Sequence, residues 1–157
     1  MISFVKALKH SVLWVVFSVF VTLSASAGIT NPLIRVCLSL NGQFYIANLD
    51  AADGNDLPMC QFNTAQIGAQ ALLDYVDGRT DLAISAFLAS SPSDPMQVCS
   101  QNSASDLQGT SESSSLFHIC EFPDSSLIDA ETLARGANAI ENSALRNALQ
   151  SHLGGAF

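Results

Sequence analysis

The 157-residue chain has little basic charge, and all of its lysine lies at the start. Lys6 and Lys9 are its only lysines, so the chain after residue 27 has four arginines against 14 acidic residues and a formal charge of −10. Phosphate backbones and anionic lipid headgroups attract basic segments, and an acidic surface repels both. We therefore expect no nucleic-acid partner and no binding to an anionic membrane surface.

Sequence signatures of catalysis are also missing. The chain has no Gly-x-Ser-x-Gly, no His-Glu-x-x-His and no glycine-rich phosphate loop. The serines at 111 and 113–115 form a low-complexity run rather than a poised nucleophile. Acidic residues are plentiful, but abundance alone does not define the spaced carboxylate pair of a glycosidase. We expect the protein not to be an enzyme and to need no cofactor.

The residues that bind metals in proteins are not arranged as ligands. No two cysteines have Cys-x-x-Cys spacing, and His118 and His152 are far apart in sequence, so a zinc site is not supported. Asp50, Asp53 and Asp56 lie close together, but their spacing does not match the alternating ligands of an EF-hand loop. We interpret this acidic segment as a solvated hairpin turn and predict no metal site.

Residues 1–27 have the pattern of an export signal. Lys6 and Lys9 give a positive start, residues 11–23 are apolar, and Ala25-Ser26-Ala27 is a small-residue cleavage site. The apolar run is shorter than the roughly 20 residues of a membrane-spanning helix. No cysteine follows the cleavage site, so a lipid anchor is not indicated. We expect a periplasmic or secreted protein with a cleaved signal peptide, and an uncleaved N-terminal anchor is the alternative.

Four cysteines remain after the signal: Cys37, Cys60, Cys99 and Cys120. An even number in an exported chain suggests disulfides, and four cysteines allow three pairings. Cys60 and Cys120 each lie in a short apolar strand that follows another cysteine in a helix. This repetition selects Cys37–Cys60 and Cys99–Cys120.

The first copy of the repeat begins at Asn31-Pro32, because Asn caps a helix and Pro suits its first position. Asn41-Gly42 ends that helix, since Gly tolerates the left-handed conformation at a helix C-terminus. Apolar spacing and turn residues then predict a hairpin and two more helices. The expected elements are a helix at 32–40, strands at 43–49 and 57–62, and helices at 64–76 and 82–88.

The second copy begins on the same signal, Asp94-Pro95, after a polar linker at 90–93. Residues 100–115 are rich in Ser, Gln and Asn, and we expect a loose loop or a short, degraded strand there. The pattern of residues 116–122 predicts a strand, with His118 on the surface of that strand. Residues 129–149 predict a long helix that Gly136 can divide into two.

These observations predict an α+β protein of two small tandem helix–hairpin–helix modules, each stapled by one disulfide. Residues 1–27 are the signal peptide, 28–89 the first module, 90–93 the linker and 94–157 the second module. A module of about 50 residues buries only a modest core. A disulfide that closes a loop of about 20 residues adds ~3 kcal/mol of stability by constraining the unfolded chain.

Residues of both modules together resemble a known family. The first module matches the first part of the family motif, its head, more fully. The second module matches the last part, its tail, more fully. The matching residues are Asn31, Pro32, Cys37 and Gly42 in the head, and Cys120, Phe122, Pro123, Asp124, Ser126, Ile128, Asp129, Leu133, Arg135 and Gly136 in the tail. This pattern is similar to the small exported bacterial domain labelled a hemolysin, domain of unknown function 333.

The resemblance implies an exported fold with a disulfide inside each module, and it brings no catalytic residues. The chain departs from the family pattern at three positions. Ser125 stands where the family turn usually has Gly, Glu131 where Trp is common, and Ala134 where an aromatic residue is common.

We expect an exported, non-catalytic binding or structural protein that presents a rigid hairpin or loop to an unknown protein partner. A secreted, membrane-active factor is the alternative, and only the hemolysin label motivates it. A protease inhibitor is a third hypothesis, in which the loop at 50–56 or at 100–115 is held for a protease. The sequence leaves the oligomeric state open.

Overall fold

The computed structural model describes residues 31–49, 56–110 and 116–152. The expected signal peptide and most of the acidic turn at 50–56 lie outside these residues. The elements in chain order are α1 (Pro32–Ser39), β1 (Gln43–Leu49), β2 (Asp56–Phe62), β3 (Ala65–Gly68), α2 (Ala69–Val76), α3 (Leu82–Ala89), α4 (Pro95–Gln101), β4 (Ser105–Thr110), β5 (Leu116–Glu121), β6 (Leu127–Asp129), α5 (Ala130–Arg135) and α6 (Ser143–His152). The N-terminal half, α1 to α3, and the C-terminal half, α4 to α6, thus follow the same order.

The six strands form one closed antiparallel barrel in the order β1-β2-β3-β6-β5-β4. Each half contributes a three-stranded meander, and the meanders join at two seams. Ile67 of β3 pairs with Ile128 of β6, and Asn48 of β1 pairs with Thr110 of β4. The prediction of two helix–hairpin–helix modules is therefore wrong, although the α+β class and both disulfides are present. A lone meander leaves two strand edges unpaired, and closing the barrel pairs all four edges.

The two halves are related by an approximate twofold axis. In β2, Cys60 pairs with Ile67, and in β5, Cys120 pairs with Ile128. Ile67 and Ile128 therefore occupy the same place in their halves, and they pair with each other. The symmetry axis consequently passes through the β3–β6 seam.

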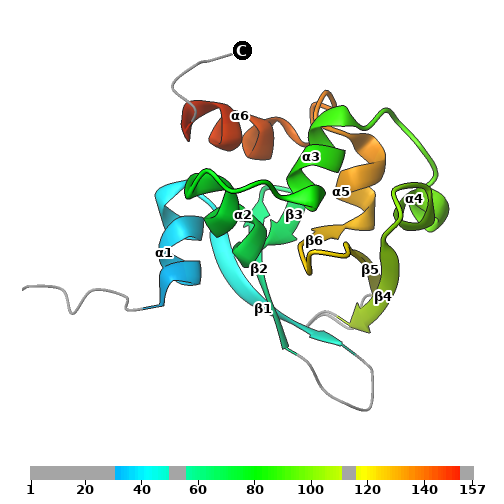
Figure 1. Cartoon of the computed structure of the whole chain (residues 1–157), viewed down its shortest axis with the longest axis horizontal. Coiled ribbons are helices and arrows are strands. Elements are labelled where there is room, and N and C mark those ends of the chain that lie inside the picture. The colour runs from blue at the N-terminus through cyan, green and yellow to red at the C-terminus, as the bar shows by residue number, and fades with distance from the viewer. Residues whose placement is uncertain (1–30, 50–55, 111–115, 153–157) are drawn as a thin grey trace, which may run out of the picture.

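Two hydrophobic cores fill the molecule. Side chains that point into the barrel form the smaller core, which consists of Ala47, Met59, Ile119 and Leu127 with the partly buried Tyr45, Leu57, Leu107 and Phe117. The larger core lies between the outer face of the strands and the helices, and it runs through both halves. Figure 1 shows the helices gathered over one part of the barrel, while the β1–β2 hairpin extends away from them.

The last helix of each half packs on the other half. Helix α3 contacts α5 and β6, and its Phe87 side chain is fully buried in the larger core. Helix α6 lies beside the end of α1, where Ala144 and Ala148 border the same crevice as Leu40 and Phe62. The halves are therefore interlocked rather than simply adjacent.

Both predicted disulfides are confirmed. Cys37 is bonded to Cys60 with a Cα–Cα distance of 5.6 Å, and Cys99 is bonded to Cys120 with a Cα–Cα distance of 5.0 Å. Each bond ties the first helix of a half to its middle strand. Because the bonded cysteines are buried, the bonds lie inside the larger core.

The structure changes the predicted bounds or type of the elements in three segments. Residues 65–68 form β3 and not the start of a helix, because β2 and β6 supply their hydrogen-bond partners. Within 100–115 a real strand, β4, pairs with β5, so the strand alternative holds for that segment. The long helix predicted at 129–149 does end a first segment at Gly136, as expected, but residues 136–142 are not helical and the second segment, α6, starts only at Ser143. Asp129, the first residue of the predicted helix, belongs to β6.

Candidate functional site

The turn between β5 and β6, which belongs to the family-like motif, binds the start of α3. The carboxylate Oδ2 of Asp124 accepts a hydrogen bond from Leu82 N at 2.9 Å. The hydroxyl oxygen of Ser126 accepts one from Ala83 N at 3.0 Å, and the same hydroxyl donates to Asp124 Oδ1. The first N–H groups of a helix have no partner within it, so the C-terminal half supplies the caps for α3.

Asp81 completes this capping site from the N-terminal half. Its Oδ1 accepts the N–H of Ile84 at 2.8 Å, and its side chain is buried. Burial raises the pKa of Asp81 to about 6, although the N–H of Ile84 opposes the change, and the negative charges of Asp124 and Asp74 add to it. Asp81 is therefore a helix cap that titrates close to neutral pH.

The pKa of Asp124 is shifted in the opposite direction, below its ordinary value. Burial alone would raise the pKa of its carboxyl group, but the hydrogen bonds from Ser126 and Leu82 outweigh burial and lower the pKa. The site thus holds one carboxylate that stays ionised beside one that is easily protonated.

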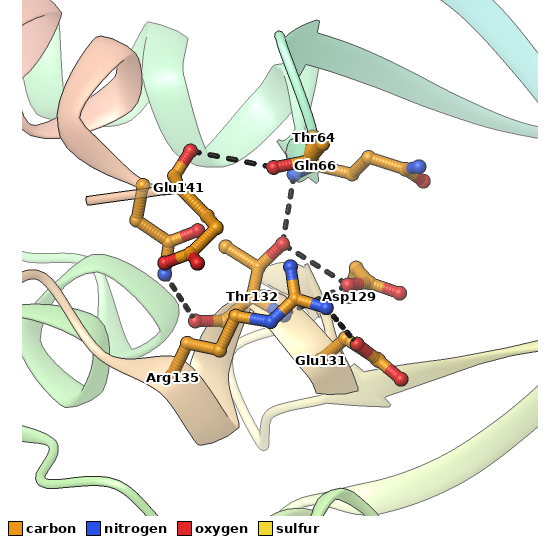
Figure 2. Close-up of polar contacts among 8 residues, drawn as sticks. Thr64, Gln66, Asp129, Glu131, Thr132, Arg135 and Glu141 are labelled. Atoms are coloured by element: carbon orange, nitrogen blue, oxygen red, sulfur yellow. Dashed lines mark hydrogen bonds and ion pairs between the residues drawn. The ribbon is translucent and has the colours of Figure 1, made fainter. Parts of the chain in front are cut away.

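A second polar network joins α5 to β3 (Figure 2). Asp129 caps α5, since its Oδ2 accepts the N–H of Thr132 at 2.8 Å and the Thr132 hydroxyl at 3.0 Å. The Thr132 hydroxyl oxygen accepts the N–H of Gln66 at 2.9 Å. Burial raises the pKa of Asp129, although the bonds from Thr132 act against it. This network is therefore a second tie between the halves.

Tyr45 brings a polar group into the barrel near this network. Its hydroxyl donates a hydrogen bond to Gln66 Oε1. Burial raises the pKa of Tyr45, and the negative charge of Asp129 adds to the effect, so the phenol stays neutral. The corresponding positions in the C-terminal half are Leu107 and Leu127, so this polar pair belongs to one half only.

Asn142, directly before α6, is fully buried and holds the end of α5. Its amide nitrogen donates to Thr132 O at 2.8 Å and to Gly136 O at 2.9 Å. Gly136 has a φ of +72°, and a Cβ atom on it would lie 2.6 Å from Ser90 O. Only glycine fits this position without strain, because the conformation is left-handed and the neighbouring backbone is close. On the surface nearby, Arg135 pairs with Glu131.

The remaining motif residues start, end or fill the elements. Asn31 Oδ1 accepts the N–H of Leu33 at 2.9 Å, Pro32 is the first residue of α1, and Gly42 N donates to Cys37 O at 2.8 Å. Phe122, Ile128 and Leu133 are buried in the larger core, whereas Pro123 is an exposed turn residue.

His118 lies on β5, on the strand face opposite Phe117, as expected. Its Nδ1 is 3.0 Å from Asp106 Oδ2 of the neighbouring strand β4. This pair sits on the outer face of the barrel, because Phe117 and Leu107 beside it point into the interior core. Within residues 31–49, 56–110 and 116–152, no three His, Cys, Asp or Glu side chains come together as metal ligands.

The sequence interpretation missed the partners of the motif residues. Asp81 is visible as part of a helix start, but nothing local indicates that Asp124 and Ser126 cap the same helix. Likewise, Gln66 and Thr132 carry no signal of their contact, because they lie in different halves. What the arrangement does chemically is to satisfy backbone N–H groups at helix starts with side-chain oxygens.

Comparison with protein-family models, with curated proteins and with solved structures finds no significant match to this chain. In the described part of the chain, every helix is too short or too polar to cross a membrane. The two disulfides fit a protein that folds in an oxidising compartment rather than in the reducing cytosol.

Proposed function

We propose that the chain is an exported, non-catalytic binding or structural protein, delivered by the signal at 1–27 to the periplasm or the exterior. The observation that carries this proposal is the use of the motif residues as caps. Asp124, Ser126 and Asp129 all accept hydrogen bonds from backbone N–H groups at helix starts. Residues that would be candidates for chemistry therefore hold a scaffold together. The two disulfides support export, because they suit an oxidising compartment.

The surface offers side chains that a protein partner could cover. Leu38 of α1, Ile46 of β1, Met96 of α4 and Ile140 before α6 are exposed although they are large and apolar. Single exposed apolar residues are common on any protein, but they are also the anchors around which protein interfaces form. We propose that one of these residues marks the contact with the partner.

Site-specific photo-crosslinking in the producing cell tests the proposal. A photoreactive residue replaces each of the four exposed residues in turn, and crosslinked products are identified by mass spectrometry. We expect one partner protein from one position and none from the others. No product, or the same products from every position, would contradict the binding role. Leakage from liposomes caused by the purified protein would support the membrane-active alternative instead.

A further inference from the structure

A groove runs between α1 and α2 on the N-terminal half. Its lining residues are Pro32, Arg35, Val36, Ser39, Leu73 and Val76. Most of these side chains are apolar, and the volume is about 300 Å³. The groove is shallow and open to solvent, so it suits one aliphatic chain laid along the surface better than a large ring system.

Arg35 gives the groove a positive charge that no acidic side chain of the described residues neutralises. Arg79 pairs with acidic side chains of its own segment, and Arg135 pairs with Glu131. Arg146 donates to a backbone carbonyl instead. Among the described residues, the Arg35 side chain thus forms no hydrogen bond or ion pair with the rest of the chain. It lies beside the apolar residues of the groove.

The fold itself does not require this groove. When positions are counted from the helix cysteine of each half, Arg35 on α1 corresponds to Gln97 on α4. The helix that would form the second wall is also shorter in the C-terminal half, because α5 has 6 residues and α2 has 8. The cation and the longer wall therefore distinguish one half from a counterpart with the same architecture.

We propose that the α1–α2 groove binds a single-chain amphiphile with a carboxylate end, of the class of medium-chain fatty acids. The aliphatic chain lies along Val36, Leu73 and Val76, and the carboxylate pairs with Arg35. A guanidinium group binds a carboxylate through two parallel hydrogen bonds, which adds direction to the charge attraction. The inference rests on the proposed function as a binding protein and names a ligand class for it.

Titration of the oxidised, exported protein with dodecanoate below its micelle concentration tests the proposal, with amide NMR shifts as the readout. We expect saturable shifts confined to α1 and α2. Arg35→Gln should weaken binding about tenfold, which is the loss of one charged hydrogen-bonded contact. The matched control Arg135→Gln removes the same charge from the surface of α5 in the C-terminal half and should leave the affinity within about twofold, since exposed charges far from a site act weakly.

Dodecyltrimethylammonium, which has the same chain and the opposite charge, should bind at least about tenfold more weakly than dodecanoate. The ligand assignment is overturned if shifts spread beyond α1 and α2, if nothing saturates, or if both arginine variants lose affinity equally. A failed titration beside a crosslinked protein partner would reject this ligand and leave the binding role intact. Circular dichroism of each variant shows that the fold is unchanged.

Discussion

Ile67 of β3 pairs directly with Ile128 of β6, and both side chains are fully buried. Each of the two also pairs with the disulfide cysteine in the middle strand of its own half. The joint between the halves is thus a symmetric, apolar seam, and polar caps surround it. This joint buries surface that neither half can cover alone.

Ser126→Ala should destabilise the protein by about 1–2 kcal/mol, because it leaves the N–H of Ala83 without an acceptor in a buried position. Denaturant unfolding followed by circular dichroism measures the change. Thr64→Ala is the control. Thr64 lies in the corresponding turn of the other half, and its exposed hydroxyl makes one longer bond to Glu141 O. Its cost should stay below about 0.5 kcal/mol, and equal costs would contradict the capping role across the halves.

Asp81→Asn should stabilise the protein at pH 7. The pKa of Asp81 is about 6 in the folded chain, against about 3.9 in an unfolded chain. The folded state therefore binds the proton more tightly, so this group's contribution falls as the pH rises from about 4 to about 6. Asparagine keeps the capping oxygen and removes the charge, and we expect a gain of about 1–3 kcal/mol.

Unfolding midpoints between pH 4 and pH 7 measure this effect. The profile of Asp81→Asn should be flatter than that of the parent chain. Asp94→Asn serves as the control, because Asp94 caps α4 through Met96 N but is exposed. Its pH profile should follow the parent chain. Parallel profiles for Asp81→Asn and the parent would show that Asp81 does not carry the pH dependence.

Replacing both cysteines of one disulfide by alanine should cost about 3 kcal/mol for either pair, because the two closed loops are of nearly equal length. The bonded residues are separated by 23 positions in Cys37–Cys60 and by 21 in Cys99–Cys120. Denaturant unfolding compares the two variants. Mass spectrometry of a non-reduced digest checks the pairing, and a peptide that links residue 37 to residue 99 would refute it.

Ser125→Gly should raise the melting temperature, because Ser125 has a φ of +65°. A left-handed conformation costs a residue with a Cβ atom about 1 kcal/mol relative to glycine. Asn63, in the corresponding turn, has a φ of +56° but is a residue type that tolerates this conformation. Asn63→Gly should therefore give a smaller gain. A lower melting temperature for Ser125→Gly would mean that its hydroxyl matters more than its backbone.

The helix starts and the disulfides could be predicted because their signals are local. Asn31-Pro32 and Asp94-Pro95 each carry their cap beside the first turn, and the structure shows both caps in use. The repeated cysteine pattern likewise selected the correct pairing. The closed barrel could not be predicted from local signals. Strand β3 is short, and its strand conformation depends on pairing with β2 and with β6 of the other half.

The candidate site shows the same limit. Asp129 is recognisable as the start of a helix, and it does cap α5. The bond from Gln66 N to the Thr132 hydroxyl joins the two halves, and no spacing in the sequence encodes it. The burial of Asp81 is equally non-local, because the turn that carries Asp124 covers the start of α3. Contacts of this kind depend on closure of the barrel.

Closure of the barrel at both seams has a consequence for how the protein is made. The N-terminal half of the chain emerges first, and at that moment β1 and β3 each present an open edge. The backbone groups at these two edges have no strand to pair with until residues 105–129 have emerged. A nascent chain that stalls in between displays the two edges that a second stalled chain can fill, so two such fragments would complete one barrel between them.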